Sequence, residues 1–253
     1  MLESKMNNYA IFIQVRMNSS RFPNKSLKNI DGSPLFLYIA NNLKKHFKNL
    51  VILTSTDKSD LKIKEICLQN NLVFFLGDLN NVLSRFYNAN LSFGYNNIIR
   101  ITADCPFSDP SIIKKIIKNH FKYNNDYTSN ILKPSFPQGL DVEMFKKSTL
   151  QKIHSSAKQE YEKEHVTLFL RNNQNLFKCQ NIAYKKNLSH IRLCIDYKED
   201  LLFVKKILRN LKKNKLSKNY QNIIKLIENK NIPHFDKLNK KNTFKKNLKS
   251  AKF

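Results

Sequence analysis

The sequence predicts an α/β protein with a mostly parallel, doubly wound sheet. Two observations support this prediction. Apolar runs with strand character alternate in the first half of the chain with segments of helical periodicity. This β-α-β-α order with apolar strands is typical of a parallel sheet that has helices on both faces. The connections between the parallel strands are expected to be right-handed.

The first half supplies four expected strands, over residues 9–15, 49–55, 72–77 and 97–104. The helical segments follow them in order, over residues 34–47, 59–70, 81–93 and 109–121. The last of these helices has a clear start, because Asp109 can cap its N-terminus and Pro110 suits the first helical position.

The second half is less regular, and we expect it to form a small irregular subdomain. Short strands are expected over residues 126–130, 140–145, 177–184 and 191–196, and helices over residues 159–172, 199–211 and 219–229. Order is expected to fade near residue 240. We therefore predict one domain over residues 1–240 and a basic, flexible tail over residues 241–253.

The composition excludes several classes of protein. Hydrophobic residues make up 41% of the 253-residue chain, which is enough for a large core. There is no run of 18 apolar residues, so no membrane span is expected. The N-terminus lacks the apolar stretch of a signal peptide, and a cytoplasmic location is expected. The four cysteines are far apart and form no CxxC pair, which argues against a zinc site or a disulfide framework.

The formal net charge of +26 raises the alternative of a nucleic-acid-binding protein. Lysine supplies most of this charge and is spread along the whole chain together with asparagine, whereas arginine, which is favoured for base readout, is scarce. A general composition bias explains this pattern better than a nucleic-acid surface does. We therefore expect no nucleic-acid partner.

A polar cluster follows the first expected strand. Ligands of open α/β sheets bind beyond the carboxyl ends of the strands, and a loop that leaves a strand there exposes backbone N–H groups to anions. The cluster adds positive charge and hydroxyl donors through Arg16, Ser19, Ser20, Arg21 and Lys25. This combination favours a polyphosphate. The segment contains no glycine, so it is neither a Walker loop nor a GxGxxG motif, and an ordinary charged surface loop is the alternative.

Two aspartates follow other expected strands. Asp104 comes after the fourth strand, and Asp196 ends the expected strand over residues 191–196. Because Mg²⁺ binds one or two carboxylates together with phosphate oxygens, this pair suits a metal–nucleotide site. Asp104 can instead cap the turn that follows it. A basic loop combined with two such aspartates points to phosphoryl or nucleotidyl transfer.

Six motifs, spread in order over residues 9 to 240, resemble those of a known family. They are IQVRMNSSRFPNKSL, GDLNNVLSRFYNA, RITADCPFSDP, FPQGLDVEMF, EKEHVTLFL and IRLCIDYKEDL. The first is similar to the signature IQARMGSTRLPGKVL of the cytidylyltransferases of spore coat polysaccharide biosynthesis. That family is related to the synthetases of CMP-Kdo and CMP-N-acetylneuraminic acid.

The resemblance implies a Rossmann-like nucleotidyltransferase (GT-A-like) fold, with CTP as cosubstrate and Mg²⁺ as cofactor. It implies that a sugar hydroxyl attacks the α-phosphate and releases pyrophosphate. The nucleotide would be bound by Arg16, Ser19, Ser20, Arg21, Lys25 and Arg85. The metal would be held by Asp104 and Asp196, and Arg16, Lys25 and Asp104 would be catalytic.

The motifs nearer the sugar imply further substrate contacts, from Gln138, Asp141, Glu143, Glu164, His165 and Arg192. An anionic acceptor would need its own basic pocket, for which Arg100 and Arg192 are candidates. Each of these residues also has a plain structural alternative, such as a surface ion pair for Glu164 or a hydrogen-bonded core position for His165.

The chain departs from the signature at three positions. Asn18 and Asn24 replace glycines, and asparagine tolerates the left-handed backbone conformation better than most residues. Val15 replaces an alanine and could crowd the pocket of the base. The fold is expected to survive these changes.

We expect a cytidylyltransferase that acts on a sugar or an acidic sugar for a surface polysaccharide. The alternatives are a polyol phosphate or other phosphorylated acceptor on the same fold, a nucleic-acid-binding protein and a non-catalytic scaffold. The sequence does not name the sugar, and a homodimer is one possible assembly.

Overall fold

The computed structural model describes residues 8–229. The end of the expected domain and the expected basic tail, residues 230–253, lie outside the described residues. No helix in the described part is long and apolar enough to cross a membrane.

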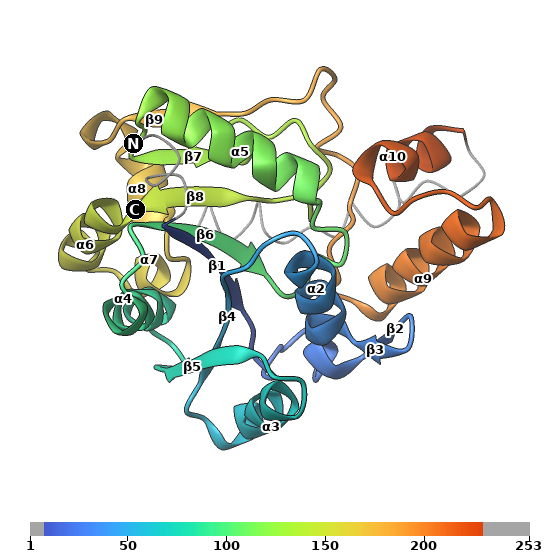
Figure 1. Cartoon of the computed structure of the whole chain (residues 1–253), viewed down its shortest axis with the longest axis horizontal. Coiled ribbons are helices and arrows are strands. Elements are labelled where there is room, and N and C mark those ends of the chain that lie inside the picture. The colour runs from blue at the N-terminus through green and yellow to red at the C-terminus, as the bar shows by residue number, and fades with distance from the viewer. Residues whose placement is uncertain (1–7, 230–253) are drawn as a thin grey trace.

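A seven-stranded sheet organises the molecule, in the strand order β5-β4-β1-β6-β8-β7-β9 (Figure 1). Strands β5, β4, β1 and β6 are mutually parallel, and β8 runs antiparallel to both of its neighbours. The strand bounds are β1 Tyr9–Gln14, β4 Leu50–Ser55, β5 Val73–Gly77, β6 Asn97–Thr102, β7 Tyr127–Ser129, β8 Glu143–Lys146 and β9 Cys179–Asn181. The mostly parallel, doubly wound sheet is confirmed.

Helices cover both faces of this sheet. They are α2 Leu35–Lys44, α3 Leu61–Gln69, α4 Val82–Phe93, α5 Pro110–Tyr123, α6 Lys147–Ser156, α7 Glu160–Glu164, α8 Leu168–Asn172, α9 Lys198–Lys213 and α10 Tyr220–Glu228. Short pieces complete the chain: 3₁₀ turns η1 Lys25–Leu27, η2 Lys58–Asp60 and η3 Gln174–Leu176, and the hairpin of β2 Asn29–Ile30 and β3 Ser33–Pro34.

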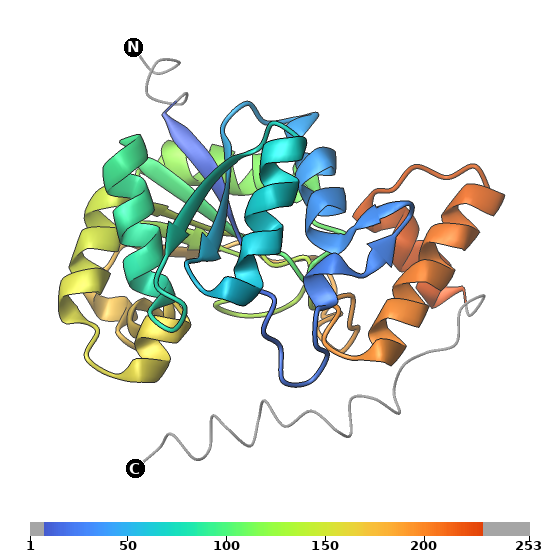
Figure 2. The same cartoon turned by 90° about the horizontal axis from the view of Figure 1, so that it is seen from below.

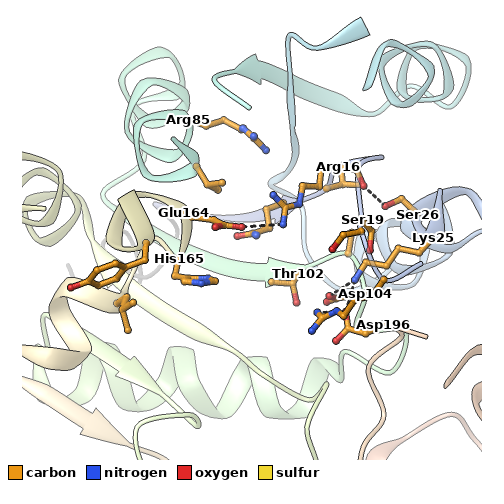
Figure 3. A pocket seen from close by; sticks show the side chains of 18 of the residues that line it. Arg16, Ser19, Lys25, Ser26, Arg85, Thr102, Asp104, Glu164, His165 and Asp196 are labelled. Carbon is orange, nitrogen blue, oxygen red and sulfur yellow. Dashed lines mark hydrogen bonds and ion pairs between the residues drawn. The ribbon is translucent and has the colours of Figure 1, made fainter. Parts of the chain in front are cut away.

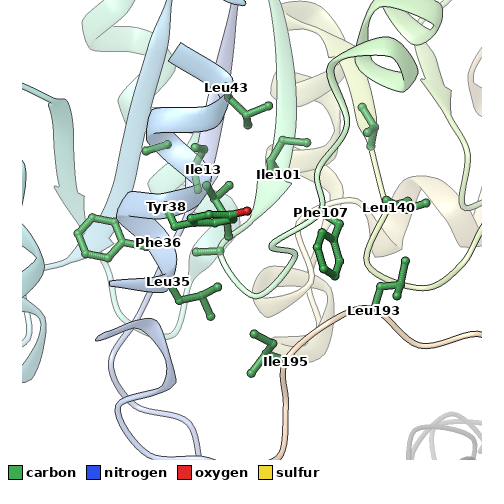
Figure 4. Close-up of a cluster of buried hydrophobic side chains, with 14 of the residues drawn as sticks. Ile13, Leu35, Phe36, Tyr38, Leu43, Ile101, Phe107, Leu140, Leu193 and Ile195 are labelled. Carbon is green, nitrogen blue, oxygen red and sulfur yellow. The ribbon is translucent and has the colours of Figure 1, made fainter. Parts of the chain in front are cut away.

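Strand β1 is buried on both faces, because its side chains alternate between two apolar clusters. Ile11 and Ile13 belong to the larger cluster, which includes the apolar faces of α2, α3, α5, α9 and α10. Figure 4 shows part of it, with Ile13 and Ile101 of the sheet near Leu43 of α2. Phe12 belongs to the second cluster, with the apolar sides of α4, α6 and α8.

The four strands and four helices expected in the first half are all present. Asp109 caps α5 as expected, because its carboxylate accepts a hydrogen bond from the Ser111 backbone N–H at 2.7 Å, and Pro110 opens the helix. Helix α6 and the β2–β3 hairpin were not expected. The expected helix over residues 159–172 is broken into α7 and α8.

The expected strand over residues 191–196 is wrong. This segment forms only an isolated β-bridge, between Gln138 and Arg192. It lies between the loop that carries Gln138 and the turn that carries Asp104. Leu193 donates its N–H to the carbonyl of Gln138 at 2.7 Å, and Ile195 donates to the carbonyl of Asp104 at 2.8 Å. Asp196 therefore ends an extended segment, which is nevertheless tied directly to the turn after β6.

This arrangement gathers three segments at the carboxyl ends of the parallel strands. They are the loop after β1, the turn after β6 and the extended segment over residues 191–196. Figure 2 shows the loop after β1, in dark blue, projecting beyond the sheet between the yellow helices and the orange α9. The three polar clusters of the sequence therefore face one region.

Candidate active site

A buried carboxylate, that of Asp60, holds the start of the loop after β1. Asp60 accepts hydrogen bonds from the backbone N–H of Met17 at 2.7 Å and from the backbone N–H of Ser55 at 3.1 Å. Ser26 donates its hydroxyl to the carbonyl of Arg16 at 2.8 Å and closes the loop from the other end. The loop thus has a defined shape before any ligand binds.

Asn24 explains how this loop manages without the signature glycines. Its φ is +56°, in the left-handed region that asparagine tolerates, and it directly precedes the turn η1 that carries Lys25. The expectation for Asn24 is confirmed. Asn18, which replaces the first glycine of the signature, does not have a positive φ. An asparagine at this position therefore causes no backbone strain.

Lys25 joins the two predicted metal aspartates. Its Nζ lies 2.9 Å from Oδ2 of Asp104 and 2.8 Å from Oδ1 of Asp196. Residues from three distant parts of the chain thus meet at one ammonium group. The prediction that the basic loop and the two aspartates come together is supported by this geometry.

The charges of this cluster hold one another in the ionised state. Burial favours the neutral form of Lys25, but Asp104 and Asp196 outweigh it, so the pKa of Lys25 lies well above its ordinary value. Burial likewise raises the pKa of Asp104, but the Lys25 ammonium outweighs burial and the net pKa lies well below the usual range. The pKa of Asp196 is lowered in the same way.

Two arginines also contact Asp196. Arg192 donates from Nη2 to Oδ2 of Asp196 at 2.7 Å, and Arg21 lies 3.2 Å from Oδ1, the oxygen that Lys25 also contacts. Arg192 also donates from Nε to Asp200 at 3.1 Å. Arg192 is therefore neutralised by two acids. It orients a site carboxylate and is a poor candidate for a free anion-binding group.

These residues line a cavity of about 720 Å³. In Figure 3, Lys25, Asp104 and Asp196 lie on one side of it, and Glu164 and His165 lie on the other. Arg16 reaches across and pairs with Glu164 at 3.1 Å. The cavity is also lined by Ser19, Ser20, Arg21, Arg85, Thr102 and Arg171. It is large enough for a nucleoside triphosphate and a second small substrate.

Arg85 lines the cavity, as the nucleotide-side prediction requires, and it also has a structural role. Its guanidinium donates to the carbonyl of Asp78 at 2.6 Å and to that of Leu79 at 3.1 Å. The side chain is packed against Gly77, where an added Cβ would lie 2.7 Å from Cγ of Arg85. The sequence therefore needs a glycine at the end of β5 to admit this arginine.

The predicted substrate residues divide into two groups. Glu164 and His165 line the cavity, whereas Arg100, Gln138, Asp141, Glu143 and Arg192 do not. Arg100 forms an ion pair with the buried Glu143, which also accepts hydrogen bonds from Tyr127 and Thr167. Arg100 donates from Nε to Gln14 at 2.8 Å as well. Arg100 and Glu143 thus form an internal network behind the cavity wall, and Arg100 carries no free charge.

Gln138 and Asp141 flank the same network. Gln138 exchanges backbone hydrogen bonds with the segment that carries Asp196. The Asp141 side chain is exposed to solvent on one side and packed against protein atoms on the other. This surrounding protein and the charge of Glu143 raise the pKa of Asp141 to about 6. Neither residue lines the cavity, and Gln138 supports the site through its backbone bonds to the segment that carries Asp196.

A strained turn aims His165 into the cavity. Val166 has a φ of +52°, which is unfavourable for a β-branched residue, and Thr167 donates its N–H to the carbonyl of His165 at 2.6 Å. This is a γ-turn with positive φ, a rare and strained form. It breaks the expected helix into α7 and α8, and such strain is concentrated at functional sites.

Sequence reasoning missed several cavity residues. Gln14 and Thr102 are the last residues of β1 and β6, and their position at the carboxyl ends of strands was the signal. Arg171 directly follows the quoted motif EKEHVTLFL. Asp60 belongs to no quoted motif, and its contact with Met17 is visible only in the fold.

The two aspartates fit a magnesium ion. One cationic atom, Nζ of Lys25, already contacts carboxylate oxygens of both residues, so both can reach a single cation. No group of three or more histidine, cysteine or acidic residues within residues 8–229 could hold a metal by itself. Two carboxylates completed by phosphate oxygens are what Mg²⁺ uses at nucleotide sites, in contrast to an all-protein cage.

The parallel sheet and the cavity at its carboxyl edge, lined by a basic loop and two carboxylates, define an enzyme of the nucleotidyltransferase class. A family model described as "Cytidylyltransferase" matches residues 10–242. The chain therefore belongs to the cytidylyltransferase family.

Similar proteins agree with this assignment. The chain is 31% identical over 209 residues to the spore coat polysaccharide biosynthesis protein SpsF of Bacillus subtilis, covering 79% of this chain and 86% of that protein. It is 34% identical over 194 residues to an uncharacterized protein of Methanocaldococcus jannaschii, covering 74% and 78%. A solved cytidylyltransferase structure from Leptospira borgpetersenii superimposes with a TM-score of 0.82 at 30% identity, covering 88% and 94%.

A more distant structure shares the fold. The CTP complex of CMP:2-keto-3-deoxy-manno-octonic acid synthetase matches with a TM-score of 0.60 at 12% identity, covering 80% of this chain and 99% of that one.

Proposed function

We propose that this enzyme transfers CMP from CTP to a hydroxyl group of a sugar or acidic sugar and releases pyrophosphate, for a surface polysaccharide or glycoconjugate. The observation that carries the proposal is the contact of one loop lysine, Lys25, with both Asp104 and Asp196 at the edge of the cavity. Support for a polysaccharide product comes from the similarity to a spore coat polysaccharide biosynthesis protein.

The phosphates would bind over the loop after β1. Arg21 and Lys25 provide positive charge beside the metal carboxylates, and Ser19 and Ser20 line the same part of the cavity. On nucleotide binding, Lys25 would leave part of its contact with the aspartates and pair with the β- and γ-phosphate oxygens. It would then stabilise the negative charge that develops on the pyrophosphate leaving group.

The reaction exchanges one bond at phosphorus for another. The acceptor oxygen forms a bond to the α-phosphorus while the bond from this phosphorus to the oxygen that bridges it to the β-phosphate breaks, and the hydroxyl proton passes to water. Asp104 and Asp196 would hold Mg²⁺, which would supply positive charge to the phosphates and help pyrophosphate to leave. The protein contributes chiefly by positioning the two substrates and by stabilising charge.

The base would lie against the apolar part of the wall. Val15, directly after β1, and Val82, on the same helix as Arg85, line the cavity. This surface suits a flat pyrimidine ring. The predicted nucleotide role of Arg85 would then be to fix the backbone over residues 78–79, which shapes the base pocket.

Calorimetric titration tests the proposal. CTP, UTP, ATP and GTP would each be added with Mg²⁺ to the wild-type protein and to the Asp104→Asn variant. We expect CTP to bind selectively, and we expect this binding to depend on Mg²⁺ and on Asp104. Binding that shows no nucleotide preference, or that is indifferent to Asp104, would contradict the proposed function.

A further inference from the structure

Arg171 stands out among the basic residues that line the cavity, because the others are already paired. Arg16 pairs with Glu164, Arg21 with Asp196, and Lys25 with both aspartates, while Arg85 is bound to two backbone carbonyls. In the part of the chain that the structure describes, the Arg171 guanidinium forms no ion pair, and its Nε is buried without a hydrogen-bond partner.

A buried and unpaired guanidinium nitrogen is costly, so such a group is expected to meet an acceptor when the site is filled. Glu143 attracts Arg171 electrostatically, but the two residues form no ion pair, and Glu143 is already paired with Arg100 and accepts hydrogen bonds from Tyr127 and Thr167. Arg171 lines the cavity, so a ligand bound there can supply the partner that its guanidinium lacks.

Arg171 is one of three arginines whose charges act on His165. Burial is the largest cause that lowers the pKa of this histidine; the charge of Glu164 raises it, and the charges of Arg100, Arg171 and Arg16 lower it. Arg16 is paired with Glu164 and Arg100 with Glu143, so among these three arginines the charge of Arg171 is the one available to a negatively charged ligand. Leu168, one helical turn before Arg171, lines the cavity on the same helix and offers an apolar surface beside the charge.

The geometry of the reaction decides which substrate reaches this wall. The leaving pyrophosphate must lie near Lys25, Asp104 and Asp196, and the attacking hydroxyl must approach the α-phosphorus from the opposite direction. In Figure 3, Glu164 and His165 lie across the cavity from Lys25 and Asp196. Arg171 lies on α8, which begins at Leu168, three residues after His165. Arg171 therefore belongs to the cavity wall that carries Glu164 and His165.

We infer that Arg171 binds an oxyanion, a carboxylate or a phosphate, on the acceptor substrate and thereby selects anionic acceptors. This inference rests on the proposed cytidylyl transfer. Arg171 takes the anion-binding role that the sequence suggested for Arg100 and Arg192. The charge of Arg100 is neutralised by Glu143, and that of Arg192 by Asp196 and Asp200. The planar guanidinium can bind either oxyanion through two parallel hydrogen bonds.

The test measures pyrophosphate release with CTP and Mg²⁺ for a panel of acceptors. The panel contains 2-keto-3-deoxy-manno-octonic acid, N-acetylneuraminic acid, the carboxamide of each, and a sugar phosphate and a polyol phosphate with their dephosphorylated forms. We expect wild-type protein to use an anionic member at least tenfold better, in kcat/KM, than its uncharged counterpart. The carboxylate and phosphate arms tell which oxyanion is selected.

Two variants then assign the effect to Arg171. Arg171→Met is expected to raise KM for the anionic acceptor at least tenfold, while KM for CTP stays within twofold. Arg171→Lys is expected to give a KM for the acceptor between those of the wild-type protein and Arg171→Met, because a lysine keeps the charge but cannot form the two parallel hydrogen bonds. Arg209→Met is the matched control, since Arg209 is exposed on α9 and does not line this cavity.

The outcomes separate this inference from the proposed function. If the wild-type protein does not bind CTP in calorimetry, the proposed function fails and the inference fails with it. If CTP binds but no anionic member of the panel reacts or binds to the nucleotide-loaded protein, only the inference is overturned. An Arg171→Met variant that weakens CTP instead of the acceptor, or that changes neither, also overturns it.

Discussion

Nζ of Lys25 lies 2.9 Å from Oδ2 of Asp104, a residue that is 79 positions away in the chain. The same nitrogen lies 2.8 Å from Asp196. The lysine of the loop after β1 therefore contacts both of the carboxylates proposed to hold a metal ion. Under the proposed function, nucleotide, metal and lysine would rearrange together when the substrates bind, and this coupling gives the first two predictions.

Replacing Asp104 by Asn should abolish turnover and leave the fold intact. We expect kcat/KM for CTP to fall at least 1,000-fold, or about 4 kcal/mol of transition-state stabilisation, because a metal ligand and its charge are lost. The free energy of unfolding should fall, because Asp104 is held ionised by Lys25, but Asn still offers an oxygen to Lys25, which also keeps Asp196, so the fold should persist. Steady-state kinetics and urea unfolding measure the two effects.

The control for this prediction is Asp57→Asn. Asp57 is a solvent-facing cap of η2, and asparagine caps equally well. This control should keep wild-type kinetics. Near wild-type turnover in Asp104→Asn would remove Asp104 from the catalytic site.

Replacing Lys25 by Met should make the nucleotide-free protein more responsive to Mg²⁺. Without the ammonium, Asp104 loses the cation it is paired with, and its pKa should rise toward the usual range, whereas Asp196 keeps Arg21 and Arg192. Mg²⁺ no longer competes with a lysine for these oxygens. The melting temperature should therefore rise more on addition of Mg²⁺ in this variant than in the wild-type protein.

Turnover of Lys25→Met should nevertheless fall about 100-fold or more, because a charge that stabilises the leaving pyrophosphate is lost. The double variant Lys25→Met with Asp104→Asn is the control, and it should lose the additional response to Mg²⁺. Equal Mg²⁺ responses in Lys25→Met and wild type would show that Lys25 does not compete with the ion.

The convergence of the basic loop with Asp104 could be predicted from sequence, because each follows an apolar strand and such strands end at one edge of a parallel sheet. Asp196 reaches the same place for another reason, a backbone hydrogen bond from Ile195 to Asp104. That residues 191–196 form no strand of the sheet could not be predicted. Ile191, Leu193 and Ile195 alternate toward the core and are buried, which is what a strand would show. Periodicity reports which side chains are buried, and it does not report which backbone supplies the hydrogen bonds.

The availability of the Arg171 charge was also beyond sequence reasoning. Its position depends on the strained turn at Val166, and local propensity gives no reason for a β-branched residue to adopt positive φ. Arg100 and Arg192 looked equally suitable as anion-binding residues until the fold showed their acidic partners. An arginine's charge is available for a ligand only where the protein has not already neutralised it.

Replacing Gly139 by Ala should damage both stability and the site. Gly139 has a φ of +94°, and an added Cβ would lie 2.6 Å from the backbone N of Cys194. The clash would push away the segment that carries Arg192 and Asp196. We expect a loss of about 3 kcal/mol in the free energy of unfolding, from strain at an unfavourable φ combined with backbone displacement.

The matched control for Gly139→Ala is Gly94→Ala. Gly94 has a φ of +73° with open space around its Cα, so alanine should cost only the left-handed conformation, about 1 kcal/mol. Urea unfolding gives both values, and calorimetry with CTP should show weakened binding for Gly139→Ala alone. Equal costs at the two glycines would show that the contact with Cys194 is easily relieved.

His120 should make the protein less stable as the pH falls. The side chain is buried in the sheet side of α5, where its ring nitrogens contact Thr128 at 3.0 Å and Asn97 at 3.1 Å. Burial, with a smaller contribution from the charge of Lys146, lowers the pKa of His120 to about 4. Its pKa in the unfolded chain is about 6.5, so the unfolded state binds the proton first.

The sign follows from this order. The contribution of neutral His120 is fully present above about pH 6.5 and is lost as the pH falls toward 4, which amounts to about 3 kcal/mol over this interval. Asp141, with a pKa raised to about 6, acts in the opposite sense in the same interval.

The comparison is therefore made between wild-type protein and His120→Gln, in which Asp141 is unchanged. We expect the difference in unfolding free energy between the two proteins to shift by about 3 kcal/mol in favour of His120→Gln between pH 7 and pH 4. Urea unfolding at several pH values measures it, and a difference that is independent of pH would mean that His120 keeps an ordinary pKa in the folded protein.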